Sequence, residues 1–155
     1  DHKEISEVLH ITEENSRKML SRAKQELKNP PTVVNAACSK EYVEKYLEVI
    51  YNGDVEQLEN LLHDDISIIS DGGGKASALL RPLYGKSLAA KFLVGVFRKF
   101  YSTSDIRIQK TNINHQPALL LYKNQKLSVC QVFEFDNGNI RRIYFVRNPD
   151  KLRAL

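Results

Sequence analysis

Two short runs of charged and small residues could carry out ionic recognition. The first is Asp71-Gly72-Gly73-Gly74-Lys75 and the second is Asn148-Pro149-Asp150-Lys151-Leu152. Each run offers a carboxylate and an ammonium group, so both could form directional ion pairs, which contribute little free energy when exposed. Three successive glycines weaken a strand without a gain in packing and favour a close backbone approach by another segment. The alternative interpretation is a plain turn with a solvated Lys75, followed much later by a chain end at which Pro149 stops the last strand.

Side chains suited to acid–base catalysis are scattered along the chain. Such catalysis needs a buried carboxylate as the base and a tyrosine or protonated acid facing the developing oxyanion. The pocket candidates are Asp71, Tyr84, His115, Tyr122 and Tyr144, and no spacing joins them into one constellation. Aromatic residues in a small sheet more often belong to the core. We therefore expect no enzymatic activity, and the binding of a small-molecule ligand without turnover stays open as an alternative.

The sequence predicts no metal site and no cofactor. The histidines His2, His10 and His63 lack ligand spacing, and the cysteines Cys38 and Cys130 are too few for a disulfide scaffold. Apolar stretches run for only a few residues, so no segment can span a bilayer, and no cationic-then-apolar leader opens the chain. We expect a cytoplasmic protein with reduced thiols and no membrane partner. Because the first residues already lie within an amphipathic pattern, we expect a fragment of a longer protein.

Composition and charge limit how the chain could bind nucleic acid. Its 155 residues are 42% hydrophobic and 27% charged, which suits one well-buried domain with a short appendage. The net charge is +4, and the whole excess lies in residues 141–155. A basic patch that binds nucleic acid by charge alone is therefore absent. Any contact with DNA must depend on geometry.

The first 28 residues show the pattern of a helix-turn-helix. Ile5, Val8 and Leu9 recur at helical spacing, the pattern stops at residues 10–11, and Thr12 is a typical N-cap for a second helix. Two short helices joined by a turn of this kind can place the second helix in the major groove of DNA. The alternative is a helical hairpin with a solvated charged face. The polar residues that would face DNA are Glu13, Asn15, Arg17, Lys18, Arg22 and Lys24.

The rest of the chain follows a proline-containing linker and is predicted to be α+β. We divide the sequence into residues 1–28, a linker at 29–37 and a domain at 38–155. Helices are expected around 43–50, after residue 54 and after Gly85, with a short strand at 66–70. From residue 106 onward the pattern is typical of strands, and Asn137-Gly138 favours a tight hairpin. This order predicts a curved antiparallel sheet packed on helices. The inward face of the helix after Gly85 is expected to carry Leu88, Phe92, Leu93, Val96, Phe97 and Phe100.

The element order and the two charged runs together resemble a known family. The domain resembles the SnoaL-like branch of the nuclear transport factor 2 superfamily, a cone in which a bent sheet wraps a long helix. The runs 71–75 and 148–152 resemble paired signatures of extracytoplasmic-function sigma factors with such a domain fused after sigma region 4. Residues 4–17 are similar to the helix-turn-helix of that region. The sequence departs from the family at His10, where a glycine is frequent, and at the linker, which lacks the usual tryptophan.

The resemblance implies binding rather than chemistry. The helix-turn-helix would read a promoter's upstream element. The cone domain would regulate the sigma factor in cis through the runs 71–75 and 148–152. The implied partners are promoter DNA, core RNA polymerase and sigma region 2 of the same full-length chain. The alternatives are a small-molecule-binding domain or an isomerase-like or cyclase-like enzyme, and a scaffold that forms a homodimer through its sheet.

Overall fold

The computed structural model describes residues 1–28, 36–102 and 105–155, with the side chains of Ala23, 25–28 and 36–40 left out. The chain divides into two compact units, Asp1–Val33 and Val34–Leu155. Most of the predicted linker at 29–37 lies outside the described residues, and helix α3 (Ala36–Asn52) begins within it. The side chain of Cys38 is likewise not described. Among the described residues, no helix is long and apolar enough to cross a membrane.

The first unit is a pair of helices joined by a tight turn, as its sequence pattern predicts. Helix α1 (His2–Leu9) is capped by the side chain of Asp1 and ends at His10, whose backbone is left-handed with φ 52°. Helix α2 (Glu13–Lys28) follows. The hydroxyl of Thr12 accepts a hydrogen bond from the N–H of Asn15 at 3.2 Å, which satisfies one of the free N–H groups of the first turn. The turn therefore adopts at His10 the conformation for which glycine is otherwise preferred.

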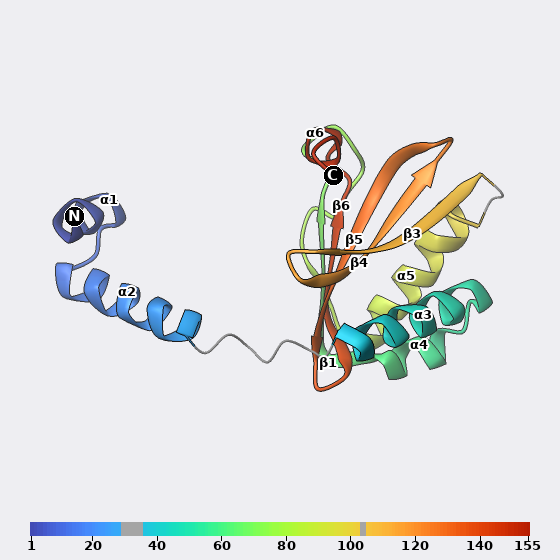
Figure 1. The fold of residues 1–155 in the computed structure, drawn as a ribbon, viewed down its shortest axis with the longest axis horizontal. Helices are drawn as coiled ribbons and strands as arrows, with labels where there is room; N and C mark the ends of the chain where they lie inside the picture. Colours follow the sequence, from blue (N-terminus) through green and yellow to red (C-terminus); the bar gives the residue numbers. More distant parts are fainter. Residues whose placement is uncertain (29–35, 103–104) are drawn as a thin grey trace. The chain divides into compact units, whose positions relative to one another are not determined.

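The second unit packs helices on one face of a curved sheet (Figure 1). Helix α4 (Val55–Leu61) starts at the N-cap Asp54, which accepts from the N–H of Gln57 at 2.9 Å. Helix α5 (Lys86–Phe100) is the helix that the sequence predicts after Gly85. Together α3, α4 and α5 cover the same side of the sheet in Figure 1, and the short α6 (Pro149–Leu152) follows the last strand.

Six strands form one sheet in the order β2-β1-β6-β5-β4-β3. They are β1 (Leu62–Asp71), β2 (Leu83–Tyr84), β3 (Ile106–Ile113), β4 (Gln116–Lys123), β5 (Lys126–Asp136) and β6 (Asn139–Val146). The meander from β3 to β6 is antiparallel, with positive φ angles at Asn124 and Gln125 and at Asn137 and Gly138 in its last two hairpin turns.

The sheet is mixed rather than purely antiparallel, which corrects the prediction. Strand β1 pairs with β6 in parallel, with Ile68 opposite Ile143 and Asp71 opposite Val146. Strand β1 is also longer than the predicted segment 66–70, and the two-residue strand β2 carries no sequence pattern that predicts it. Helix α5 and four strands (β2, β3, β4 and β5) separate β1 from β6 along the chain, and the last hairpin returns β6 in the direction of β1.

The core lies between the helices and the inner face of the sheet. Tyr46, Leu93 and Phe133 are almost fully buried there. One residue of α5 expected to face inward does not, because Leu88 is 58% exposed, whereas Phe100 in the last turn is 39% exposed and only partly covered. The buried face of α5 contains Ala89, Ala90 and Leu93, and Leu88 lies beside that face rather than on it. The α+β fold is otherwise as predicted.

Candidate functional site

The two charged runs of the sequence meet at one edge of the sheet. Strands β1 and β6 are parallel neighbours, so the segments that leave their carboxyl ends start side by side. The carbonyl oxygen of Asp71 accepts two hydrogen bonds, from the N–H of Arg147 at 2.7 Å and from that of Asn148 at 3.1 Å. In Figure 1, α6 lies beside the loop that follows β1. We call this junction of residues 71–75 and 148–152 the clasp.

The glycines of the clasp permit close backbone approaches. The N–H groups of Lys75 and Ala76 both donate to the carbonyl of Gly72 at 3.0 Å, which closes a tight turn. A Cβ atom on Gly72 would lie 2.0 Å from the carbonyl oxygen of Ala76, and one on Gly73 would lie 2.2 Å from the amide nitrogen of the Asn148 side chain. Side chains at these two positions would therefore displace the loop or the second run.

Short-range hydrogen bonds shape the second run into a helical turn. The Asn148 side chain caps α6 by accepting from the N–H of Asp150 at 3.0 Å, and Pro149 occupies the first helical position, where its missing N–H costs nothing. Leu152 is 7% exposed and packs with Leu120 and Cys130 on the outer face of the sheet. The run is thus fixed at both ends rather than being a loose chain terminus.

Two reciprocal ion pairs join the runs. The ammonium of Lys75 lies 2.5 Å from a carboxylate oxygen of Asp150, and that of Lys151 lies 2.8 Å from one of Asp71. The hydrogen bond from Lys151, together with the N–H of Gly73, lowers the pKa of the Asp71 carboxyl. Lys75 is therefore exposed, as a plain turn would have it, but it is also paired with the second run. Each run supplies one acid and one base to the other.

The four remaining pocket candidates do not converge. Tyr84 lies on the edge strand β2 and is 66% exposed, and His115 lies in the turn between β3 and β4. Tyr122 lies beneath the guanidinium of Arg107, 3.9 Å from ring centroid to carbon, and Tyr144 lies in a cluster with Glu134 and Arg142. For Tyr122 and Tyr144 strand alternation explains this, because their neighbours Leu121 and Phe145 line the central cavity and point to the other face. None of the four lines either described cavity.

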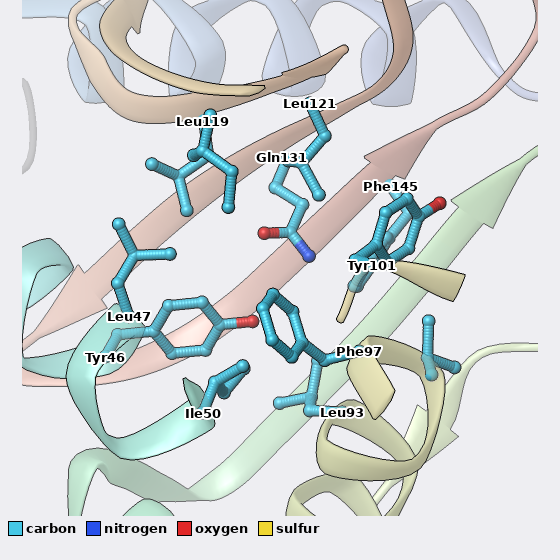
Figure 2. Close-up of a pocket in the computed structure, with 12 residues that line it drawn as sticks. Tyr46, Leu47, Ile50, Leu93, Phe97, Tyr101, Leu119, Leu121, Gln131 and Phe145 are labelled. Atoms are coloured by element: carbon cyan, nitrogen blue, oxygen red, sulfur yellow. The ribbon is translucent and has the colours of Figure 1, made fainter. Parts of the chain in front are cut away.

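The cavity at the centre of the cone is lined almost entirely by apolar side chains. In Figure 2 the hydroxyl of Tyr46 points toward the amide of Gln131, with Phe97 and Leu93 around them. Burial raises the pKa of the Tyr46 hydroxyl, so it stays protonated at neutral pH. None of the twelve residues that line this cavity carries a carboxylate. It therefore lacks the general base that an isomerase-like reaction needs.

The predicted DNA-facing residues lie on α2. Except for the half-buried Glu13, all are exposed. Arg17 pairs with Glu13 and Lys18 with Glu14, each across one helical turn at 2.7 Å. Either base must therefore exchange a weak intrahelical pair before it contacts nucleic acid.

Comparisons with known proteins show similarity to a sigma factor and to cone-shaped α+β structures. No family model matches the chain. It is 26% identical over 100 residues, 63% of its length, to the ECF RNA polymerase sigma factor SigJ of Mycobacterium tuberculosis. The crystal structure of SigJ matches 99% of the chain with a TM-score of 0.60 and 20% identity. A steroid delta-isomerase from Pseudomonas aeruginosa matches 76% of the chain and 85% of its own with a TM-score of 0.52 and 17% identity.

The chain is thus homologous to an extracytoplasmic-function sigma factor, and its fold is that of the cone-shaped, nuclear transport factor 2-like proteins. It spans about a third of the length of SigJ, since the aligned part is 32% of that sequence, and 55% of the solved SigJ chain. The predicted family resemblance is confirmed.

Proposed function

We propose that this chain is the promoter-reading and regulatory part of an extracytoplasmic-function sigma factor, acting in the cytoplasm. Helix α2 contacts the upstream promoter element, and the clasp forms the surface through which the cone domain regulates core polymerase binding in cis. The partners are promoter DNA, core RNA polymerase and sigma region 2 of the full-length protein. Homology to SigJ supports the sigma-factor role in transcription.

The observation that carries the regulatory role is the reciprocal pairing in the clasp. Lys75 and Asp150 are 75 positions apart in sequence, yet they pair directly, and the pair is half-exposed on both sides. Exposed pairs of this kind contribute about 0.2–1 kcal/mol, too little to be needed for folding. The clasp is a charged, ordered and accessible surface whose ion pairs contribute little to folding stability. Such a surface suits recognition by a partner, because the partner's own charged groups can take the place of one member of each pair.

The central cavity gives catalysis no support beyond the fold. The fold likeness to a steroid isomerase supports the alternative of an enzyme, but the fold alone does not confer a reaction. The cavity lining lacks a carboxylate and the predicted tyrosines point elsewhere. The enzyme alternative therefore rests on the fold alone.

Run-off transcription with the full-length parent protein and core polymerase tests the regulatory role. Lys75→Ala and Asp150→Ala should change the output from the parent's own promoter by up to about fivefold, the equivalent of one exposed ion pair. Lys110→Ala is the matched control, because it breaks an exposed pair with Glu44 of 2.6 Å outside the clasp. Equal output from all three variants, at wild-type stability, would exclude the clasp as the regulatory surface.

Promoter-binding measurements with the full-length parent protein and core polymerase test DNA reading by α2. Arg17→Ala and Lys18→Ala should each weaken promoter binding about tenfold, within the range measured for side chains that contact bases. Lys3→Ala on α1 is the control, since Lys3 is exposed and basic but not in the predicted interface. Unchanged promoter affinity in both α2 variants would refute this role for the helix.

A further inference from the structure

A second cavity, of about 200 Å³, opens beside the clasp. Its wall combines the last turns of α5 with the ends of β1 and β6 and with the segment that follows the glycine loop. Aromatic rings from Phe92, Phe100 and Phe145 form much of this wall. The remaining lining residues are Ser70, Ser77, Ala78, Leu79, Val96, Tyr101 and Arg147. Unlike the central cavity, this one carries a charge.

The charge belongs to Arg147. One terminal nitrogen of its guanidinium donates to the carbonyl oxygen of Ser77 at 2.5 Å. Its Nε atom is buried and has no hydrogen-bond partner among the residues that the structure describes. A buried polar group without a partner is costly, and a charged one more so.

Other basic side chains nearby differ from Arg147 in having acidic partners. Lys75, Lys151 and Arg153 lie 2.5, 2.8 and 3.7 Å from carboxylate oxygens. Within the described part of the chain, the guanidinium of Arg147 forms no ion pair with a carboxylate, and none of the ten lining residues is acidic. The cavity thus presents an uncompensated cation beside apolar rings, which is the complement of an anion with an apolar body.

We propose that this cavity binds a small monocarboxylate whose apolar part is about the size of one aromatic ring, with its carboxylate on the guanidinium of Arg147. An engineered cavity of about 150 Å³ holds benzene, so the larger volume here has room for a ring and a short acidic arm. The planar guanidinium matches a carboxylate in geometry. Tyr101, which is 6% exposed, adds a hydroxyl to the lining, and burial raises the pKa of that group, which keeps it a donor.

Binding would act directly on the clasp. The backbone N–H of Arg147 donates to the carbonyl of Asp71, while its side chain holds Ser77, two residues beyond Lys75. A carboxylate that draws the guanidinium from Ser77 would release the segment that follows the glycine loop. This regulatory consequence rests on the proposed function, whereas the binding itself does not.

Titration of the whole chain with phenylacetate, followed by two-dimensional amide NMR, tests the proposal. We expect saturable shifts that include the amides of Arg147 and Phe145. The neutral analogue phenylacetamide should bind about tenfold more weakly or worse, because it cannot form the charge-assisted bonds. No saturation with phenylacetate, or equal affinity for both compounds, would overturn the proposal.

Variants locate the site and separate it from the function of the clasp. Arg147→Gln should lose binding, whereas Arg141→Gln, which removes a paired arginine near the start of β6, should keep it. If Arg147→Gln does not fold, Val96→Phe provides a second variant: it fills the cavity, leaves the cation in place and should also lose binding. Full binding by folded Arg147→Gln, or by Val96→Phe, would refute the site. Transcription is not measured here, so a failure of the sigma-factor proposal leaves this outcome unaffected.

Discussion

Substitution of two adjacent glycines by alanine separates backbone strain from contact across the clasp. Gly73 and Gly74 both have left-handed backbones, with φ of 58° and 69°. Alanine should therefore cost each position about 1–2 kcal/mol of strain. At Gly74 nothing lies within 4 Å of the new methyl group, whereas at Gly73 the methyl group would lie 2.2 Å from the Asn148 side chain. Asn148 must then rotate away and lose its capping bond to α6, which costs about a further 1 kcal/mol.

We therefore expect Gly73→Ala to lower the free energy of unfolding by about 1 kcal/mol more than Gly74→Ala does. Urea denaturation, followed by far-ultraviolet circular dichroism, measures both values. Asn148→Ala supplies the internal check, because in that background the obstructing side chain is absent and the two glycine variants should cost the same. Equal destabilisation in the wild-type background would refute the close approach of the two runs and with it the geometry of the clasp.

Two further perturbations test the same region. Lys151 lowers the pKa of Asp71 from its ordinary value of 3.8, so this pair stabilises the fold above that pH, and its contribution fades as the pH falls through the lowered pKa. The free energy of unfolding of wild type and of Lys151→Met, measured from about pH 2 to 6, should therefore differ near pH 6 and become equal at the acidic end. Leu152→Ala removes the side chain that packs on Cys130 and should cost about 2–3 kcal/mol. Burial raises the pKa of the Cys130 thiol to about 11, so in a Cys38→Ser background Leu152→Ala, which uncovers this thiol, should also speed its reaction with a thiol reagent. An unchanged rate would contradict the packing.

The parts of the fold that the sequence predicts are those with local causes. The Asn137-Gly138 pair takes positive φ angles and closes the last hairpin, and Asp54 caps α4 through the N–H of Gln57. Thr12 likewise caps α2. Each of these depends on residues no more than three apart, so the amino-acid types alone specify the geometry.

What the sequence does not predict depends on pairing between distant segments. The parallel contact of β1 with β6 has no local signature, and β2 consists of two residues paired only to β1. Leu88 is apolar but lies one position off the buried face of α5, a difference that a periodic pattern does not resolve. Arg147 follows a strand without any motif, and its place on a cavity wall emerges from the fold. A single basic residue between the apolar end of a strand and a proline-containing turn is a weak signal.

The parallel pairing of β1 and β6 is what makes a joint site of the two runs. Parallel strands end at the same edge of a sheet, so residues 71–75 and 148–152 emerge next to each other. Had β6 run antiparallel to β1, its eight residues would have carried the second run about 26 Å away, to the opposite edge. No ion pair or hydrogen bond could then join the runs. The same pairing puts Arg147 against Asp71 on one side and the cavity on the other. The proposed ligand site and the clasp therefore share Arg147, the residue that directly follows β6.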